Sequence, residues 1–453
     1  MNSNTYVTKD IKAGQGFDRT NLFRRVRRAM GSKAVLAYSG GLDTSVIIKW
    51  LQEQYGCEVV SVTLDVGQGR DFEAIEKKAW MLGVLNHYTI DAKKEFVAEY
   101  VVPAIKANAL YMDTYPVSSS LSRPLIAKKL VDVAEKEGAD TVAHGCTGKG
   151  NDQVRFDVTI KALNPDLRII APVREWNMAR DKEIEWAKEH GVPVPVTISS
   201  PYSIDQNIWG RSIECGILEY PDIEPPAEVY EWTVPVEKAP DEPEYLKIGF
   251  EKGVPASLNG VDMAPLELVG KVQEVAGKHG VGRLDHIEDR VVGLKSREVY
   301  EAPAAMTILK AHTDLEKMIL TRHEKLFKRH VDHQWAVMTY DGLWVDPLMD
   351  ALNAFIEKTQ EKVSGETTVK LFKGNVSVVG RSSPFSLYDL NLATYDIGTT
   401  YDQSHATGFI ELWGLPSVTA AILKKKSQGL SGSYRMKPVK PQAMPLPQSP
   451  KDS

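Results

Sequence analysis

The stretch Ala34–Tyr55, which reads AVLAYSGGLDTSVIIKWLQEQY, decides how the chain is expected to fold. Ala34–Tyr38 is a short apolar run with a β-branched residue, a pattern typical of a buried strand. Ser39–Gly41 then allows a sharp turn and a close approach of the backbone to a ligand. Asp43–Ser45 contains residue types that favour helix starts, and the apolar residues after it recur at i, i+3 and i+4. We therefore predict a strand, a glycine turn and a helix.

A turn of this kind presents free backbone N–H groups at the positive end of a helix dipole, which suits a phosphate. The alternative is an ordinary strand–helix turn that happens to contain two glycines. Neither G-x-x-x-x-G-K-[ST] nor G-x-G-x-x-G is present at the turn. The order Ser-Gly-Gly-x-Asp-Thr/Ser resembles instead the pyrophosphate loop of the N-type ATP pyrophosphatases, which cleave ATP to AMP and pyrophosphate. This resemblance favours phosphate binding.

The composition is that of an ordinary globular protein. The chain has 453 residues, 43% of them hydrophobic and 25% charged, which is enough for two domains and tails. Its net charge of −5 argues against nucleic acid as a partner. Three distant cysteines, Cys57, Cys146 and Cys215, exclude a disulfide framework and a structural zinc site and indicate a cytoplasmic protein. We expect no membrane association, because we identify no apolar run near the ~18–20 residues that span a bilayer.

Strands and helices alternate from Lys33 to about residue 198, which predicts a Rossmann-like parallel sheet with helices on both faces. Ligands bind such sheets at the carboxyl ends of the strands. The expected strands are 34–38, 58–64, 87–91, 141–144 and 168–173, and the expected later helices are 71–82, 92–110, 124–137 and 181–190.

Prolines 193, 195 and 201 mark a boundary, after which an α+β domain is expected. Its predicted strands are 245–250, 254–258, 285–294, 368–372 and 376–379, with hairpin turns at residues 259–260 and 373–375. Its predicted helices are 266–276 and 315–327. We therefore divide the chain into an N-terminal arm (1–32, with a helix at 19–30), an ATP-binding domain (33–200), a synthetase and oligomerisation domain (201–415) and a partly disordered tail (416–453).

A second candidate loop, HGCTGKGNDQVRF, occupies residues 144–156. Three glycines among five varied polar side chains after a strand are typical of a binding site, although a solvated loop is the alternative. Lys149 precedes a glycine, so this is no Walker loop. We expect alkylation of Cys146 to inhibit and ATP to protect. The spacing of His323, His330 and His333 fits no metal-ligand motif, and a solvated helix face is the preferred interpretation, with no metal site expected there.

Six motifs together resemble the argininosuccinate synthases, over residues 33 to 415. They are AYSGGLDTS (37–45), HGCTGKGNDQVRFD (144–157), PYSIDQN (201–207), RSIECGILE (211–219), AGKHGVGRLD (276–285) and IEDRVVGLKSREVYEAP (287–303). The resemblance implies a ligase that joins L-citrulline to L-aspartate through citrullyl-AMP and releases AMP and pyrophosphate. It also implies a homotetramer assembled through the C-terminal region, in which Leu412–Leu423 is apolar enough to take part.

The resemblance also implies a role for each matching position. ATP would be held by Ala37, Tyr38, Ser39, Gly40, Gly41, Leu42, Asp43, Thr44, Ser45, Leu64 and Gly145. Citrulline would be held by Tyr115, Ser120, Asn151, Arg155, Ser203, Ser212, Glu288 and Tyr300. Aspartate would be held by Thr147, Asn151 and Asp152. Asp152 and Arg155 are the expected catalytic residues, and we hypothesise that Asp152 pairs with the ammonium of aspartate and helps to take its proton.

Catalysis is expected to rely on positioning and on charge stabilisation by the loop amides with Mg²⁺. Because Glu288 and Tyr300 belong to the second domain, the site is expected to be an inter-domain cleft. Other members of the ATP pyrophosphatase group are alternatives. A tRNA thiolase would need paired reactive cysteines and a basic face, and a glutamine amidotransferase would need an extra glutaminase domain. A non-catalytic nucleotide-binding module, as a sensor or scaffold, is a further alternative, but it would have no use for the converging polar residues.

Overall fold

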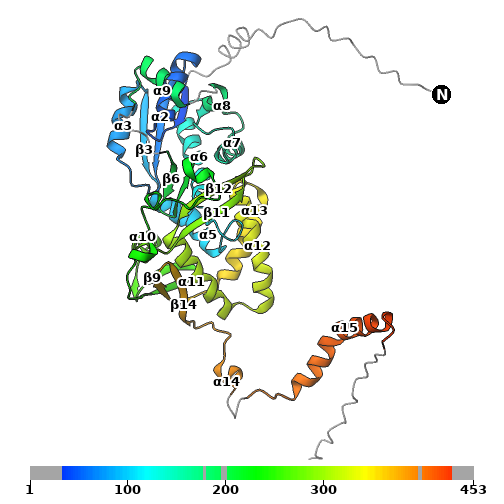
Figure 1. The fold of residues 1–453 in the computed structure, drawn as a ribbon. Coiled ribbons are helices and arrows are strands. Elements are labelled where there is room, and N and C mark those ends of the chain that lie inside the picture. Colours follow the sequence, from blue (N-terminus) through cyan, green and yellow to red (C-terminus); the bar gives the residue numbers. More distant parts are fainter. Residues whose placement is uncertain (1–32, 177–179, 195–200, 396–399, 431–453) are drawn as a thin grey trace, which may run out of the picture. The chain divides into compact units, whose positions relative to one another are not determined.

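The protein is described by a computed structural model that covers residues 33–176, 180–194, 201–395 and 400–430 (Figure 1). These residues form two units, one that ends at Leu387 and one that begins at Tyr388. The predicted helix at 19–30 and the end of the predicted tail, from residue 431, lie outside the described residues.

A five-stranded parallel sheet forms the N-terminal half of the first unit, in the order β3-β2-β1-β4-β5. Residues Ala34 and Leu36 of its central strand pack into one apolar cluster, whereas Val35 packs into a second one. Side chains alternate across a strand, so both faces of the sheet are covered, as predicted. The strands are β1 (Lys33–Ala37), β2 (Glu58–Asp65), β3 (Asn86–Asp91), β4 (Thr141–Ala143) and β5 (Arg168–Ile170).

The helices of this half lie on the two sides of the sheet (Figure 1). Helix α2 packs against α8 and α9, whereas α6 packs against β1, β4 and α7. The helices are α2 (Leu42–Trp50), continued by η1 (Leu51–Tyr55), α3 (Phe72–Met81), α4 (Lys93–Phe96), η2 (Val97–Val101), α5 (Val102–Lys106), α6 (Ser118–Glu137), α7 (Asp152–Leu163), α8 (Pro172–Trp176) and α9 (Arg180–Glu189).

Three predicted boundaries in this half are wrong, and two of the errors involve a proline. The helix predicted at 92–110 already ends at Lys106, the last residue of α5. Strand β5 ends at Ile170 because Pro172 opens helix α8, where its fixed φ suits a first turn. Helix α6 begins at Ser118, six residues before Pro124, the predicted first residue of this helix. Pro124 therefore lies inside the helix. In the turn before it, the hydroxyl of Ser122 donates to the carbonyl of Ser119 at 2.9 Å.

Two antiparallel sheets build the rest of the first unit. Both predicted hairpin turns are confirmed, and the left-handed φ values of 53° and 79° at Asn259 and Gly260 are those of a tight hairpin. The larger sheet has the order β10-β9-β8-β13-β14 and contains β8 (Glu244–Glu251), β9 (Val254–Leu258), β10 (Val261–Asp262), β13 (Gly365–Phe372) and β14 (Asn375–Ser382). The smaller one has the order β11-β12-β7-β6 and contains β6 (Ser203–Asn207), β7 (Gly210–Glu214), β11 (Arg283–Asp289) and β12 (Lys295–Glu301).

The predicted helix at 315–327 is wrong because the chain breaks inside it. Helix α11 ends at Ile319, and Thr321 caps the next helix by accepting a hydrogen bond from the N–H of Glu324. The predicted strand at 285–294 is also too long, since it ends at Asp289. The helices here are α10 (Pro265–Lys278), α11 (Pro303–Ile319), α12 (Arg322–Tyr340) and α13 (Pro347–Gln360), with the short η3 (Gly216–Glu219), η4 (Ala227–Val229) and η5 (Val236–Lys238).

The second unit contains α14 (Leu390–Ala393) and α15 (His405–Ser427). Helix α15 is the one helix among the described residues that is long and apolar enough, by length and composition alone, to cross a membrane. This corrects the expectation that no such run exists. Its large apolar side chains, among them Phe409 and Trp413, are exposed.

Candidate active site

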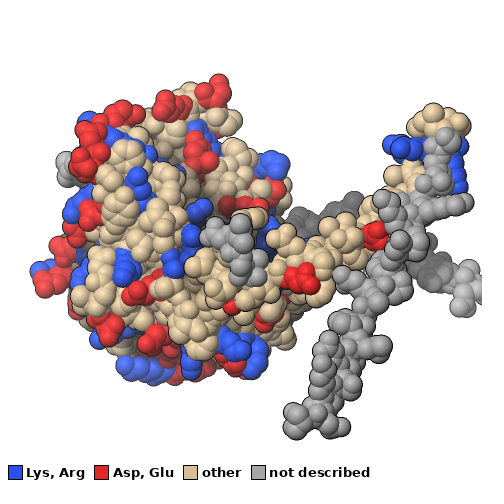
Figure 2. All heavy atoms as spheres, turned by 90° about the horizontal axis from the view of Figure 1, so that it is seen from below, with Lys and Arg blue, Asp and Glu red and all other residues tan. Residues whose placement is uncertain are grey.

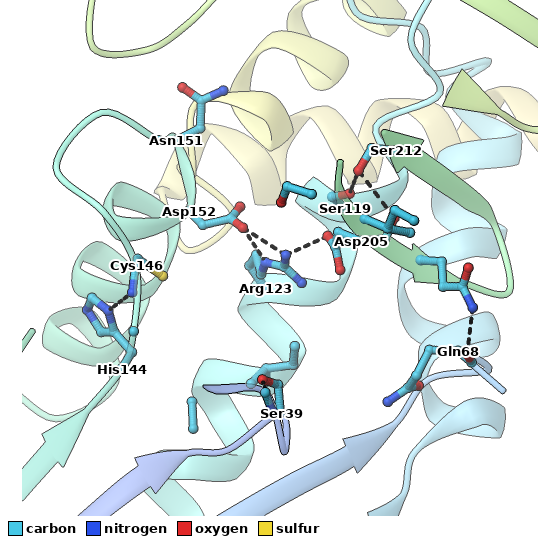
Figure 3. Close-up of a pocket in the computed structure, with 18 of the residues that line it drawn as sticks. Ser39, Gln68, Ser119, Arg123, His144, Cys146, Asn151, Asp152, Asp205 and Ser212 are labelled. Atoms are coloured by element: carbon cyan, nitrogen blue, oxygen red, sulfur yellow. Dashed lines mark hydrogen bonds and ion pairs between the residues drawn. The ribbon is translucent and has the colours of Figure 1, made fainter. Parts of the chain in front are cut away.

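A cleft of about 1120 Å³ lies at the carboxyl ends of the parallel strands. Residues that follow β1, β2 and β4 line one side, and residues of β6, β7, β11 and β12 line the other. Both halves of the first unit thus contribute to it, as expected for a cleft between them. Figure 3 shows the polar side chains that point into this space.

The glycine turn after β1 has the conformation that its sequence requires. Gly40 has a left-handed φ of 75°, and a Cβ there would lie 2.7 Å from the Cγ1 of Ile75 in α3. Helix α2 begins with Gly41 as its N-cap, so no side chain caps it. The hydroxyl of Ser45 instead donates to the carbonyl of Gly41 at 2.6 Å. Several N–H groups at the positive end of α2 therefore remain available to an anion.

A buried histidine, His144, anchors the loop after β4 by hydrogen bonds. His144 contacts Asp157 at 2.7 Å through Nε2. Its Nδ1 accepts a hydrogen bond from the N–H of Cys146 at 3.2 Å (Figure 3). Burial raises the pKa of the Cys146 thiol above its ordinary value, so the thiol is protonated at neutral pH. This cysteine lines the cleft.

A charge network occupies the middle of the cleft (Figure 3). Arg123 donates to Asp152 at 2.9 Å and to Asp205 at 2.5 Å, and Arg155 donates to Asp152 at 2.8 Å. Burial favours the neutral form of Asp152, but the two arginines outweigh it and hold the pKa of Asp152 well below its ordinary value. Asp152 is therefore a carboxylate at neutral pH. The Nη2 atom of Arg155 is buried and has no partner among the described residues.

Two tyrosines bind Glu288 in the cleft, and a third packs against them. Tyr300 donates to Glu288 at 2.6 Å and Tyr340 donates to it at 2.5 Å. Tyr340 also accepts a hydrogen bond from the amide of Asn151 at 2.8 Å. Tyr115 stacks on Tyr300, with ring centroids 4.3 Å apart. Burial raises the pKa of Glu288, while both tyrosine hydroxyls oppose that rise.

Most of the sequence-predicted site residues line this one cleft. Those that do are Ala37, Tyr38, Ser39, Gly41, Leu42, Asp43, Thr44, Leu64, Tyr115, Gly145, Thr147, Asn151, Asp152, Arg155, Ser203, Ser212, Glu288 and Tyr300. Gly40, Ser45 and Ser120 lie outside the lining. The neighbouring Ser119 does line the cleft, and its hydroxyl lies 3.2 Å from that of Ser212.

Several cleft residues were missed by the sequence analysis. Glu214, Arg290 and Glu298 lie inside motifs that were quoted, and Arg290 donates to Glu214 at 2.7 Å and to Glu298 at 2.8 Å. Arg123 and Tyr340 lie outside every quoted motif, so only the fold reveals them. Among the described residues, no group of three or more His, Cys, Asp or Glu could hold a metal ion, and His323, His330 and His333 are exposed.

A parallel sheet with a glycine turn after its first strand, facing a polar cleft, defines an α/β nucleotide-binding protein. Two family models match the chain. The arginosuccinate synthase N-terminal HUP domain matches residues 33–193, and the arginosuccinate synthase C-terminal domain matches residues 202–420.

Curated relatives match over most of their length. The argininosuccinate synthase of Pyrococcus furiosus is 62% identical over 388 residues, which are 86% of this chain and 94% of the relative. Those of Bacillus pumilus and Bacillus subtilis are each 56% identical, over 88% and 87% of this chain and 99% and 98% of the relatives. The chain belongs to the argininosuccinate synthase family, a family of ligases.

Proposed function

We propose that the cleft joins L-citrulline to L-aspartate at the expense of ATP. The ureido oxygen of citrulline attacks the α-phosphorus, the bond to the bridging oxygen breaks, and pyrophosphate leaves. The amine of aspartate then attacks the ureido carbon of citrullyl-AMP, expels AMP and loses a proton. The observation that carries the proposal is that the glycine turn and the Asp152 network face the same cleft. No covalent enzyme intermediate is needed, so alignment and charge stabilisation do the work.

ATP is proposed to lie across the carboxyl ends of β1 and β2, with its phosphates on the turn. Residues 37–45, together with Leu64 and Gly145, are the proposed ATP site. The uncapped start of α2 supports this assignment, because its N–H groups can donate hydrogen bonds to a negatively charged phosphate oxygen.

Mg²⁺ is proposed to enter with ATP and would neutralise phosphate charge. Asp43 and Thr44 supply the oxygen donors that this ion prefers, and both line the cleft.

Citrulline is proposed to lie between the tyrosine cluster and Arg155. The buried, unpartnered Nη2 of Arg155 supports an anionic group there, since an unpaired buried donor is costly. Glu288 can accept from the ureido or amino N–H groups. The proposed set is Tyr115, Asn151, Arg155, Ser203, Ser212, Glu288 and Tyr300, with Ser119, which lines the cleft, favoured over Ser120, which does not.

Aspartate is proposed to bind beside Thr147, Asn151 and Asp152. The lowered pKa of Asp152 supports an ion pair with the substrate ammonium. The same low pKa makes Asp152 a weak proton acceptor in the free protein, so its proposed role is to bind and orient the amine.

The proposed reaction is tested by measuring pyrophosphate and AMP with each amino acid omitted in turn. The expected result is release of AMP, not ADP, with full turnover only when both citrulline and aspartate are present. A tRNA-modifying enzyme or an amidotransferase would need a different acceptor. A nucleotide-binding module would bind ATP without turnover. Cleavage to ADP would overturn the proposal.

A cytoplasmic homotetramer with the domain boundaries given above is proposed as well, without a nucleic-acid or membrane partner. Positive and negative side chains are interspersed over the described residues on the face shown in Figure 2, which does not favour a nucleic-acid surface.

The exposed apolar side chains of α15, such as Ile410, Leu412 and Trp413, support a role of this helix in assembly. Light scattering of the chain with and without Trp413→Glu tests it, and an unchanged mass would contradict this role of α15.

A further inference from the structure

Two cations reach the glycine turn from the segment that follows β2. The Nη1 atom of Arg70 donates to the carbonyl of Ser39 at 3.0 Å, and the Nζ atom of Lys78 in α3 donates to the carbonyl of Gly40 at 3.0 Å. Ile75, also in α3, closes on Gly40 so tightly that a Cβ would not fit. Helix α3 therefore fixes the turn and brings positive charge to it.

Arg70 differs from the other arginines that line the cleft. Arg123 pairs with Asp152 and Asp205, Arg155 pairs with Asp152, and Arg290 pairs with Glu214 and Glu298. Among the described residues, Arg70 lines the cleft without an ion pair to any carboxylate. Its charge is thus the one among the lining lysines and arginines of the described chain that no carboxylate offsets.

The unused donors of Arg70 suit a phosphate. A guanidinium has five N–H donors, and the contact with Ser39 occupies one of them. The planar fork matches two phosphate oxygens at once. The side chain of Arg70 is exposed and contacts the glycine turn through Ser39. Its guanidinium can therefore reach an anion bound to the N–H groups of the turn without a movement of the backbone.

We propose that Arg70 binds the pyrophosphate portion of ATP and stabilises it as the leaving group, a role that rests on the proposed function for its place in the reaction. As the bond between the α-phosphorus and the bridging oxygen breaks, the negative charge that develops on pyrophosphate is met by this guanidinium. Lys78 holds the turn in place through Gly40.

Calorimetric titration of the full chain with inorganic pyrophosphate, and separately with AMP, tests this role. Arg70→Gln should weaken pyrophosphate binding by about 10-fold or more, as expected for loss of a charge-assisted contact, and change AMP binding by less than about 2-fold. Arg70→Lys should bind pyrophosphate with an affinity between that of the unsubstituted protein and that of Arg70→Gln. The matched control is Lys77→Gln, which removes the same charge from an exposed position of α3 that lies beside Glu73. It should leave both affinities unchanged.

Unchanged pyrophosphate binding in Arg70→Gln would overturn the proposal. Equal weakening of pyrophosphate and AMP would overturn it too, because the turn as a whole would then have lost its shape. The titration needs no turnover, so its result stands apart from the proposed reaction. Arg70→Gln could weaken pyrophosphate binding as expected while the unsubstituted protein releases no pyrophosphate from ATP in the presence of citrulline and aspartate. In that case the proposed function fails and the binding role of Arg70 survives.

Discussion

Arg123 donates through Nε to the carboxylate of Asp152 at 2.9 Å, and the same guanidinium reaches Asp205 at 2.5 Å. Asp152 begins α7 beside the parallel sheet, whereas Asp205 lies on β6 of the antiparallel half. A single arginine therefore ties the two halves together at the centre of the cleft. Any substrate group that enters here must join or displace part of this network.

Replacing Asp152 by Asn should raise the KM for aspartate and lower kcat. The side-chain shape is kept, but Arg123 and Arg155 lose the charge that they share. A lost charged contact corresponds to a change of about 10-fold or more, and the KM for ATP should stay within about 2-fold. Steady-state kinetics in each substrate measure this. Asp166→Asn, on an exposed loop, is the control, and unchanged aspartate kinetics in Asp152→Asn would contradict its proposed role.

Replacing Tyr340 by Phe should weaken citrulline binding. The hydroxyl of Tyr340 contacts both Glu288 and Asn151, so its loss leaves each with one partner fewer. We expect the KM for citrulline to rise by roughly 10-fold, from hydrogen bonds to a charged group worth about 1.5–3 kcal/mol. The exposed Tyr245, replaced by Phe, serves as the control. If only the KM for ATP changed, the assignment of this end of the cleft would be wrong.

Alkylation of Cys146 by iodoacetamide should be slow at neutral pH and faster as the pH rises. Burial raises the pKa of this thiol, so little of the reactive thiolate is present near pH 7. ATP should slow the reaction, since Gly145 beside it is part of the proposed ATP site. Mass spectrometry of the labelled peptide gives the rate. Rapid labelling at pH 7, or equal rates with and without ATP, would contradict this.

The sequence was sufficient for features encoded by neighbouring residues. The alternation of apolar runs predicted the parallel sheet, and Asn259-Gly260 predicted its hairpin because both residues adopt left-handed φ there. The turn at Ser39–Gly41 could be read as a phosphate site because three adjacent residues carry the signal.

Features that depend on long-range contacts could not be read in this way. Tyr340 follows an ordinary helical pattern in α12, and its position beside Glu288 arises only because two distant segments pack together. Arg123 carries no local signal either, as its partners Asp152 and Asp205 lie far along the chain. Proline also misled the prediction at Pro124, since it usually opens a helix but here lies within one.

The missed break between α11 and α12 predicts a stability effect at Thr321. Its side chain accepts from the N–H of Glu324 at 3.3 Å, and the carboxylate of Glu324 accepts from the N–H of Thr321 at 2.8 Å. Thr321→Ala should lower the free energy of unfolding by about 1 kcal/mol, the usual cost of a lost N-cap. Thr321→Ser keeps the hydroxyl and is the matched control. Denaturant titration measures both, and equal stability of the two variants would contradict the capping role.

Replacing Glu214 by Gln should stabilise the protein at alkaline pH and not at acidic pH. Burial, reinforced by Glu298 and partly offset by Arg290, raises the pKa of Glu214 to about 7. Below the ordinary pKa of 4.5 the carboxyl is protonated in both folded and unfolded chains, so ionisation costs nothing. As the pH rises from there through about 7, the unfolded chain ionises more readily, and stability is lost.

The Glu214 side chain is 37% exposed, so solvent screens part of this cost, and the gain in Tm should be modest, about 1–3 °C at pH 8. At pH 5 the gain should be clearly smaller than at pH 8, because most of the stability is lost only as the pH rises from there through about 7. Thermal melts at both pH values measure the difference. Glu228→Gln, at an exposed position, should show no pH-dependent change. A gain at pH 5 that equals the gain at pH 8 would mean that Gln packs better and that the charge of Glu214 costs nothing.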